Sequence, residues 1–241
     1  MGKISTGQRF TVVFLYNTVM GLKTLILVHG AWHGHWCWKE VQNLLSEMGV
    51  SSLAVELPFT SFEDDVKEVE STISKVDGPI VLVGHSYGGK VISQAAQGTN
   101  TITDLIYLCA FLLRENEPFA GEGQEPHPSL IKLEIAEDMS CTVRSEAITP
   151  AFYEGVEEAM AKEATSKLRP LPVSSFGPGE GESWRSIQTT YVVCNEDAAI
   201  HPERQRQMAD LADLTVEWDC AHSPFFSNPK LVADFLSTYD L

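Results

Sequence analysis

The sequence predicts an α/β fold in which a mainly parallel sheet carries helices on both faces. Short apolar runs alternate with helical patterns along the chain, as they do where crossover helices join parallel strands. Most runs are continuous stretches of Val, Ile and Leu, which is the pattern of strands buried on both faces. The length of 241 residues suits one α/β domain of about 200 to 250 residues.

Six apolar runs are the expected core strands. In chain order they are TLILVHG (24–30), SLAVELP (52–58), PIVLVGH (79–85), DLIYLCA (104–110), TYVVCN (190–195) and TVEWDC (215–220). Between them the pattern predicts helices at about 38–48, 64–76, 87–97, 202–212 and 229–238. The last of these has Leu231, Val232, Phe235 and Leu236 on one stripe, as an amphipathic helix does.

One interval is too long for a simple crossover. Residues 114–186 are acidic, hold several Pro and Gly residues, and include one good helical stretch, AFYEGVEEAMAKEATSKL. Insertions of this size are usually functional, so we expect a helical lid, or cap, over a pocket. The core is then expected at 23–113 and 187–241. Residues 1–22 are expected to be an N-terminal extension or an edge strand, with a targeting segment as the alternative.

Composition argues against several classes of function. The chain has a net charge of −16, so the phosphates of nucleic acids and of anionic membrane surfaces would be repelled. No stretch approaches 18 uninterrupted apolar residues, so we expect no transmembrane helix. The five cysteines include no C-x-x-C pair. Their odd number favours reduced thiols in a cytoplasmic protein over disulfides or a zinc site.

The stretch PIVLVGHSYGG holds the candidate nucleophile. Its residues Gly84-His85-Ser86-Tyr87-Gly88 match G-x-S-x-G, with a predicted strand before the serine and a predicted helix after it. A serine in this context sits on a nucleophile elbow, a sharp turn that lifts its Oγ above the sheet. The start of the following helix also favours negative charge that develops near Ser86.

A serine hydroxyl needs a base, and the base needs an acid to orient it. In this class of site the chain order is serine, acid, histidine, each on a loop after a strand. His222 follows the last predicted strand, in AHSPFFSNP. Asp197, which follows the strand TYVVCN, is the preferred acid. Its neighbour Glu196 is the runner-up, and Glu115, after the strand at 104–110, is a further alternative.

The loop LVHGAWHGHWCW (27–38) is expected to complete an oxyanion hole. The backbone N–H of Ala31 and that of Tyr87, the residue after the nucleophile, are the expected donors. Gly30 leaves room for the approach to the oxyanion, and Trp32 is either a core aromatic residue or a wall of an apolar pocket. The candidates for lining the pocket are Gly30, Trp32 and His85, together with His29, His33 and His35.

With these motifs the chain resembles the α/β-hydrolase superfamily, and more narrowly the small bacterial carboxylesterases and the plant methylesterase and hydroxynitrile lyase-like group. The similarity runs from about Lys23 to the C-terminus and is strongest at LVHGAWHGHWCW, LVGHSYGG, YVVCNEDAAIHPERQRQM and AHSPFFSNP. The resemblance implies an α/β-hydrolase fold with a lid inserted between core strands, here at 114–186.

Departures from relatives narrow the expected activity. Hydroxynitrile lyases of this group carry threonine where this chain has Gly30 and lysine where it has Ser223, so the resemblance favours ester hydrolysis. Dehalogenase relatives use an aspartate nucleophile where this chain has Ser86.

We therefore expect a cofactor-free, metal-free carboxylesterase that cleaves small to medium apolar carboxylic esters through an acyl-enzyme. Ser86 attacks, His222 moves the proton and Asp197 orients the imidazole. The expected partner is a small-molecule ester, with no nucleic acid and no membrane, and the chain is expected to be a monomer or a homodimer. The alternatives are a hydroxynitrile lyase-like enzyme or C–C bond hydrolase on the same fold, and a ligand-binding receptor that turns over slowly.

Overall fold

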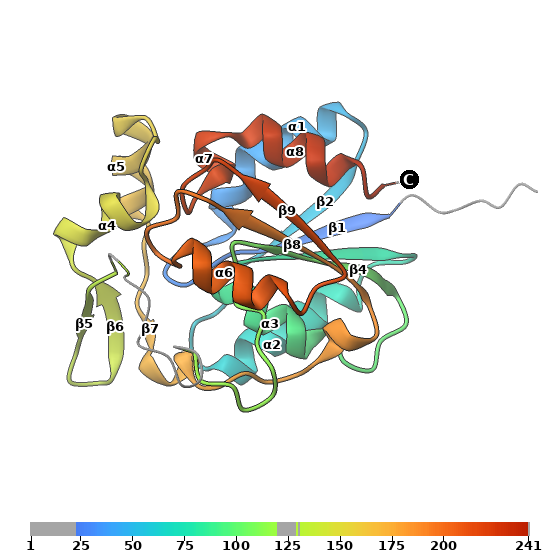
Figure 1. The fold of residues 1–241 in the computed structure, drawn as a ribbon, viewed down its shortest axis with the longest axis horizontal. Helices are drawn as coiled ribbons and strands as arrows, with labels where there is room; N and C mark the ends of the chain where they lie inside the picture. Colours follow the sequence, from blue (N-terminus) through green and yellow to red (C-terminus); the bar gives the residue numbers. More distant parts are fainter. Residues whose placement is uncertain (1–22, 120–128, 130, 241) are drawn as a thin grey trace, which may run out of the picture.

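A six-stranded parallel sheet forms the centre of the molecule (Figure 1). The computed structural model describes residues 23–119, 129 and 131–240. In chain order the strands are β1 (Thr24–Val28), β2 (Ser51–Val55), β3 (Ile80–His85), β4 (Ile102–Leu108), β8 (Gln188–Cys194) and β9 (Leu214–Trp218). Their order across the sheet is β2-β1-β3-β4-β8-β9, so the direction of winding reverses beside β1. The carboxyl ends of strands at such a reversal are where α/β proteins place their sites.

The strands differ in burial according to their place in the sheet. All six residues of β3 are buried, as a continuous apolar run in the middle of a covered sheet should be. The edge strands β2 and β9 instead include exposed positions. The predicted mainly parallel α/β sheet is confirmed, and each of the six predicted strands overlaps an observed one.

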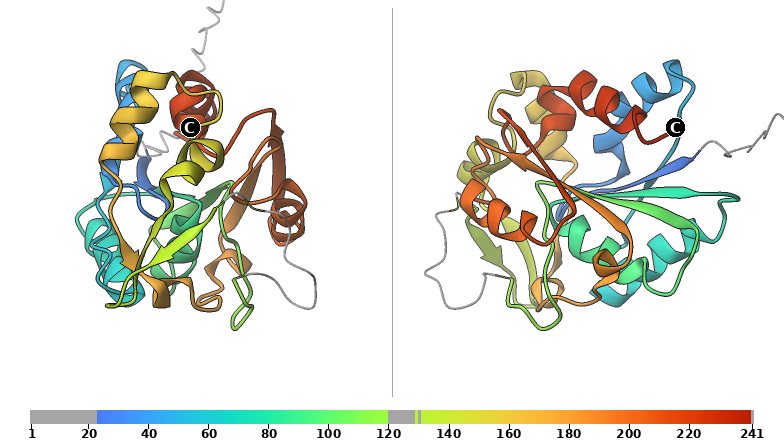
Figure 2. Two further views of the ribbon diagram at one scale, coloured as in Figure 1. Left: turned by 90° about the vertical axis from the view of Figure 1, so that its left-hand side faces the viewer. Right: turned by 45° about the vertical axis from the view of Figure 1, so that its right-hand side comes forward.

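Helices cover both faces of the sheet (Figure 2). One face carries α1 (Lys39–Glu47), α7 (Pro224–Ser227) and α8 (Pro229–Ser237), and the short helix η1 (His35–Trp38) leads into α1. The other face carries α2 (Phe62–Ile73), α3 (Tyr87–Ala95) and α6 (Pro202–Ala209). Each of the five predicted core helices is present.

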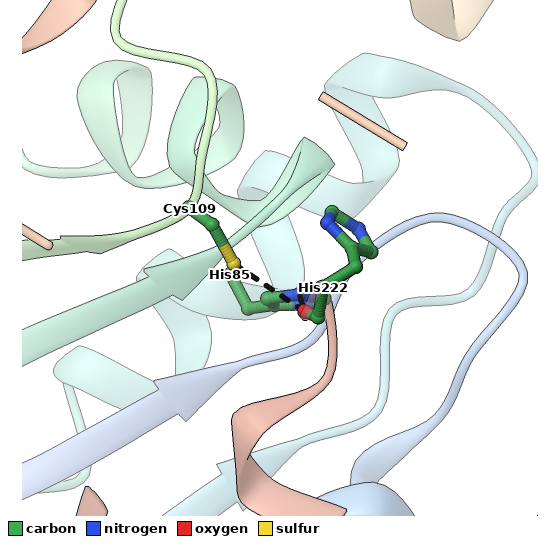
Figure 3. Close-up of side chains that lie close together, drawn as sticks. All are labelled: His85, Cys109 and His222. Carbon is green, nitrogen blue, oxygen red and sulfur yellow. Dashed lines mark hydrogen bonds between the residues drawn. The ribbon is translucent and has the colours of Figure 1, made fainter. Parts of the chain in front are cut away.

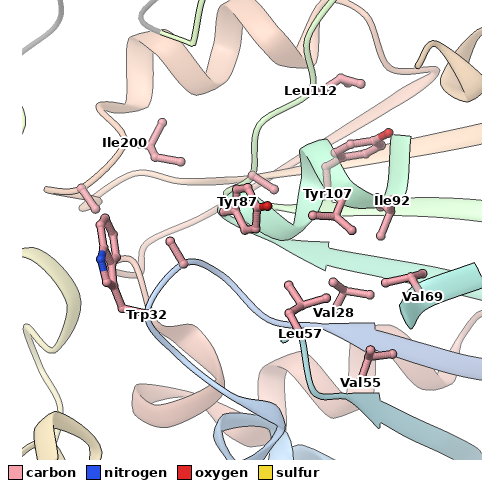
Figure 4. Packing of buried hydrophobic residues seen from close by; sticks show 14 of the residues in the cluster. Val28, Trp32, Val55, Leu57, Val69, Tyr87, Ile92, Tyr107, Leu112 and Ile200 are labelled. Atoms are coloured by element: carbon pink, nitrogen blue, oxygen red, sulfur yellow. The ribbon is translucent and has the colours of Figure 1, made fainter. Parts of the chain in front are cut away.

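An apolar core fills the space between the sheet and its helices. Figure 4 shows part of the core on the α2 and α3 face, where Val28 and Val55 of neighbouring strands meet Val69 of α2 and Ile92 of α3. A second cluster packs α1 and α8 against the opposite face. Apolar burial of this kind is the main favourable term in folding. It also makes the strand ends a rigid base for the loops that follow them.

Residues Leu133–Phe176, here called the cap segment, follow β4 and precede β8 in the chain. They lie at one end of the sheet (Figure 1). The cap segment contains β5 (Leu133–Ile135), β6 (Ser140–Val143), α4 (Ser145–Phe152), α5 (Glu158–Ser166), β7 (Leu171–Pro172) and η2 (Val173–Phe176). A last short helix, η3 (Ser183–Arg185), precedes β8. The three strands form a small antiparallel sheet in the order β5-β6-β7.

The single helical stretch predicted in this region is wrong in one respect, because α4 and α5 are separate helices. Gly155 lies between them with φ of 73°, a left-handed conformation that a continuing helix does not adopt. Whether residues 114–186 move as a lid stays a prediction.

Three further expectations concerned the N-terminal residues, membrane-spanning helices and the cysteines. The predicted extension or targeting segment at 1–22 lies outside the described residues. Among the residues that the structure does describe, no helix has the length and apolar character needed to cross a bilayer. All five cysteines are buried and free of disulfide bonds.

Candidate active site

Ser86 sits at the sharp turn between β3 and α3. Its φ of 51° and ψ of −122° are a strained combination for a residue with a side chain, and they are what a nucleophile elbow requires. A Cβ atom on Gly88 would lie 2.7 Å from the backbone oxygens of both Val28 and His29. Glycine at that position therefore allows the start of α3 to pack directly against the end of β1.

Tyr87 follows the serine and begins α3. The N–H groups of the first helical residues have no acceptor inside their own helix, so the N–H of Tyr87 can serve a ligand. The side chain of Tyr87 is fixed separately, because its hydroxyl donates to Oδ2 of Asp65 at 2.7 Å. Oδ1 of Asp65 accepts the N–H of Phe59 at 2.8 Å. Asp65 is fully buried, and burial raises its pKa to about 6.

His222 and Asp197 form a buried pair. Nδ1 of His222 lies 2.7 Å from Oδ2 of Asp197, and the two side chains are 2% and 0% exposed. Oδ1 of Asp197 also accepts the N–H groups of Ala199 and Ile200, at 2.7 and 2.9 Å. Nε2 of Gln205 donates to Oδ2 at 2.8 Å. A carboxylate only accepts, so Nδ1 of His222 carries the proton and Nε2 keeps the lone pair that a base needs.

The structure separates the three acids considered from sequence. Asp197 contacts His222, whereas the exposed Glu196 uses its backbone N–H to donate to the carbonyl of Cys220. Glu115 is also exposed, and its N–H donates to Glu182. Sequence reasoning missed Gln205, eight positions beyond Asp197 on α6, because nothing in the chain marks a helical glutamine as a partner of a distant loop carboxylate.

His85 and Cys109 anchor the backbone of His222 (Figure 3). Nε2 of His85 donates to the carbonyl oxygen of His222 at 2.9 Å, and Sγ of Cys109 donates to the same oxygen at 3.4 Å. Burial raises the pKa of the Cys109 thiol and lowers that of His85, so the thiol keeps its proton and the imidazole is neutral. One nitrogen from each imidazole and the Cys109 sulfur lie within 4.8 Å of one another. The cluster holds the loop of His222 rather than offering three lone pairs to a cation.

The loop after β1 lies directly against the nucleophile. A Cβ atom on Gly30 would lie 2.8 Å from the Cβ atom of Ser86 and 2.9 Å from Nδ1 of His85. Nδ1 of His29 donates to the carbonyl oxygen of Gly30 at 2.9 Å, and its Nε2 accepts the N–H of Leu57 at 3.1 Å. The carbonyl of Gly30 and the N–H of Ala31 point in opposite directions from one planar peptide. The histidine therefore fixes the direction of the Ala31 N–H.

An apolar cavity of about 370 Å³ adjoins these loops. Its wall includes Trp32 next to Ala31, Phe111, whose N–H donates to the backbone oxygen of Ser86, and Ala199 and Ile200, whose N–H groups hold Asp197. The cap segment contributes Leu133, Val173 and Phe176. Of the pocket residues expected from sequence, Trp32 lies in this wall, whereas His85 is completely buried beneath the site.

A serine on a strained strand-to-helix turn and a buried Asp–His pair, all on loops of one parallel sheet, are the arrangement expected of an α/β hydrolase. The family comparison agrees. A model of the Alpha/beta hydrolase family matches residues 25–235, and the chain belongs to that family. The fold family predicted from the motifs is thereby confirmed.

Curated relatives cover most of this chain. The chain is 27% identical to the alpha/beta hydrolase nvfD of Aspergillus novofumigatus, with 86% of this chain and 92% of the relative covered. It is also 27% identical to methylesterase 1 of Arabidopsis thaliana, with 87% of this chain and 93% of the relative covered. The predicted likeness to plant methylesterases is therefore confirmed.

Solved structures share the fold at lower identity. The methylesterase MES16 from Arabidopsis superposes with a TM-score of 0.75 at 22% identity, covering 90% of this chain and 98% of that one. A pyrethroid hydrolase from Sphingobium faniae JZ-2 gives a TM-score of 0.76 at 23% identity, covering 90% and 97%. At these identities the likeness shows the fold alone.

Proposed function

We propose that the protein is a serine hydrolase that cleaves carboxylic esters of small to medium apolar substrates. The observation that carries this proposal is the hydrogen bond between the buried side chains of Asp197 and His222. Ser86, the proposed nucleophile, has its backbone in a strained turn. The named activities of curated relatives support ester chemistry, since several of them are methylesterases.

In the proposed reaction Oγ of Ser86 attacks the ester carbonyl carbon, while Nε2 of His222 takes the hydroxyl proton. The negative charge moves to the carbonyl oxygen, where the N–H groups of Ala31 and Tyr87 bind it. When the carbonyl re-forms, the bond to the alcohol breaks and His222 gives its proton to the leaving oxygen. Water then attacks the acyl-enzyme with the same groups, releasing the acid and restoring Ser86.

Asp197 has two tasks in this scheme. Its bond to Nδ1 keeps the imidazole in the tautomer whose Nε2 lone pair can accept a proton. Its negative charge then stabilises the imidazolium that forms. The three other donors to the carboxylate, Ala199, Ile200 and Gln205, fix the plane in which the imidazole is held.

The cavity supports the proposed substrate class. Its wall is mostly aromatic and aliphatic, and it lies beside the loops of Ser86, Asp197 and Ala31. Such a wall favours an apolar acyl or alcohol group at about 25 cal/mol for each Å² of apolar surface removed from water. A volume of about 370 Å³ is at the small end of the range for ligand pockets, about 300 to 1,000 Å³.

The test is hydrolysis of p-nitrophenyl esters from acetate to decanoate by the wild type, Ser86→Ala and Ser227→Ala. Ser227 is a half-buried serine on α7 and serves as the matched control. We expect steady turnover in the wild type and the control, and none above background in Ser86→Ala. Turnover that survives in Ser86→Ala at the wild-type level would reject the serine mechanism.

A further inference from the structure

We propose that two residues of the cap segment, Tyr153 and Arg169, are positioning residues for the oxyanion loop, defined here as Gly30–Gly34. They act through hydrogen bonds that hold three successive carbonyl oxygens of this loop. The inference rests on the proposed function, in which the N–H of Ala31 binds the oxyanion.

Trp32 shows that the oxyanion loop needs external support. Its φ is 63°, a left-handed conformation that bulky side chains rarely adopt and that persists only where the surroundings impose it. The side chain is buried against the cap segment, with ring centroids 5.7 Å from Phe152 and 5.5 Å from Phe176. Its Nε1 donates to the carbonyl oxygen of Cys141, in β6, at 3.1 Å. Both the backbone and the ring of Trp32 are therefore held from outside its own loop.

Three carbonyl oxygens of the loop accept hydrogen bonds in succession. The oxygen of Ala31 accepts from Nδ1 of His33 at 3.0 Å. The oxygen of Trp32 accepts the backbone N–H of Arg169 at 2.8 Å. The oxygen of His33 accepts from Nη2 of Arg169 at 3.3 Å. Two of these donors belong to the cap segment, and the third, His33, is itself held by the cap segment.

Tyr153 completes the hydrogen bonding of the His33 ring. Nδ1 of His33 must carry a proton, because the carbonyl of Ala31 can only accept, and Nε2 then accepts the hydroxyl proton of Tyr153 at 2.9 Å. Burial lowers the pKa of His33 to about 3 and raises that of Tyr153, so the imidazole is neutral and the phenol keeps its proton at neutral pH. Tyr153 donates to His33, and His33 donates to the carbonyl of Ala31. This chain of hydrogen bonds runs from the end of α4 to the oxyanion loop.

Arg169 is anchored on the body of the protein as well as on the oxyanion loop. Its Nη2 donates to the carbonyl of Leu57 at 2.9 Å and lies 2.6 Å from Oε1 of Glu56. Its guanidinium stands 4.8 Å from the ring centroid of Phe59. The residue thus joins the cap segment, the oxyanion loop and the end of β2 at one point.

The consequence concerns rate more than binding. If these bonds are lost, the peptides that follow Ala31 can rotate and the backbone of Ala31 can shift. Its N–H, whose direction is set by His29 through the carbonyl of Gly30, is then no longer held against the position of the oxyanion. Because that donor matters most when charge has developed, its misplacement lowers kcat more than it raises KM. Removing an oxyanion donor outright typically costs about 100- to 1,000-fold in kcat, so a donor that is only misaimed should cost about tenfold.

The test compares Tyr153→Phe with Tyr239→Phe in the full chain. Each removes one tyrosine hydroxyl, since Tyr239 donates to Thr190 at 2.8 Å, away from the oxyanion loop. The readouts are kcat and KM for a p-nitrophenyl ester and the inhibition constant of a trifluoromethyl ketone, whose adduct with Ser86 carries an oxyanion. We expect Tyr153→Phe to lose about tenfold in kcat, with KM within about twofold. The ketone should bind Tyr153→Phe about tenfold more weakly. Tyr239→Phe should change neither kcat nor the inhibition constant.

A second set of variants keeps the test decisive if one protein folds poorly. In the His33→Ala background, Tyr153→Phe should have no further effect on kcat, because the chain of donors is already broken. Arg169→Ala should lower kcat, and Arg169→Lys should not restore it, because an ammonium group lacks the planar, fixed donor geometry of the guanidinium.

Two results would overturn the inference. One is a kcat for Tyr153→Phe within twofold of the wild type, and the other is an equal loss in Tyr153→Phe and Tyr239→Phe that follows their melting temperatures. The proposed function fails separately, if Ser86→Ala keeps turnover. Full dependence on Ser86 with no effect at Tyr153 rejects the positioning role alone.

Discussion

Nδ1 of His222 lies 2.7 Å from Oδ2 of Asp197, and the same carboxylate oxygen accepts from Gln205 at 2.8 Å. The other oxygen accepts two backbone N–H groups. Four donors to one buried carboxylate fix its orientation. His222 therefore faces a carboxylate whose orientation is fixed by three other donors.

Asp197→Asn is expected to lower kcat by about 1,000- to 10,000-fold, because an amide NH₂ facing His222 favours the wrong imidazole tautomer. The measurement is steady-state hydrolysis of the best p-nitrophenyl ester. Glu196→Gln is the matched control, since this neighbouring acid is exposed and has no contact with His222 among the described residues. A large loss in Glu196→Gln together with normal rates in Asp197→Asn would show that Asp197 is not the acid that orients His222.

Stability is expected to fall as the pH drops below about 6.5, because burial lowers the pKa of His33 to about 3 and that of His29 to about 4. In this window the unfolded chain binds protons that the folded chain cannot bind, so the free energy of unfolding decreases with acid. Between pH 6.5 and pH 5 the loss is about 2 kcal/mol per histidine, at ~1.36 kcal/mol per pH unit.

Urea unfolding at several pH values measures this slope. His33→Asn should flatten the slope by about 2 kcal/mol over the window, whatever its stability at pH 7.5. The raised pKa of Asp65, about 6, acts in the opposite direction, since its contribution is present at low pH and is lost as the pH rises through 6. Comparing variants at each pH removes that shared contribution. Equal slopes for the wild type and His33→Asn would contradict the prediction.

Gly88→Ala is expected to destabilise the fold by at least about 3 kcal/mol, because overpacking against rigid backbone cannot be relieved by a side-chain rotation. The new Cβ atom would meet the oxygens of Val28 and His29 at 2.7 Å. Gly98→Ala is the control, with φ of 72° and no atom within 4 Å of the added carbon. Its cost should be only about 1 kcal/mol, from backbone conformation alone. Chemical denaturation measures both, and similar values would refute the packing argument.

Val173→Phe is expected to shorten the longest ester that the enzyme accepts, because residue 173 lines the cavity from the cap segment. The value of kcat/KM for the decanoate should fall about tenfold, as if contacts to roughly two methylenes were lost at ~0.8 kcal/mol each. The acetate should change by less than about twofold. Val156→Phe makes the same substitution between α4 and α5, outside this cavity. An unchanged chain-length profile in Val173→Phe would place the acyl group elsewhere.

The sequence predicted the core well because core strands and helices have strong local patterns. The six apolar runs, most of them continuous, have the lengths of strands, and G-x-S-x-G between a strand and a helix marked Ser86. The cap segment was read less well. Its strands contain two to four residues, which is too short for alternation to be recognised. Gly155 separates two helices that look continuous in composition.

The contacts of the site were the harder part to predict. His33 was expected only as one of several histidines near a pocket, yet its two ring nitrogens join Ala31 to Tyr153, 120 positions away from it in the chain. The sequence also offered two neighbouring acids in one loop, Glu196 and Asp197, and their positions alone do not tell which of them contacts His222. Which of two neighbouring carboxylates turns inward is decided by donors on α6 and by the loop itself, and no local pattern encodes those donors.

The stretch from Arg169 to Phe176 hydrogen-bonds to Trp32 and also supplies two residues of the wall of the apolar cavity, Val173 and Phe176. For protein engineering, this means that the cap segment is not an interchangeable module. Grafting a relative's cap onto this core would replace the cavity wall and the support of Trp32 in one operation. A library that varies Val173 while keeping Tyr153, Arg169 and Phe176 is the design that separates the two.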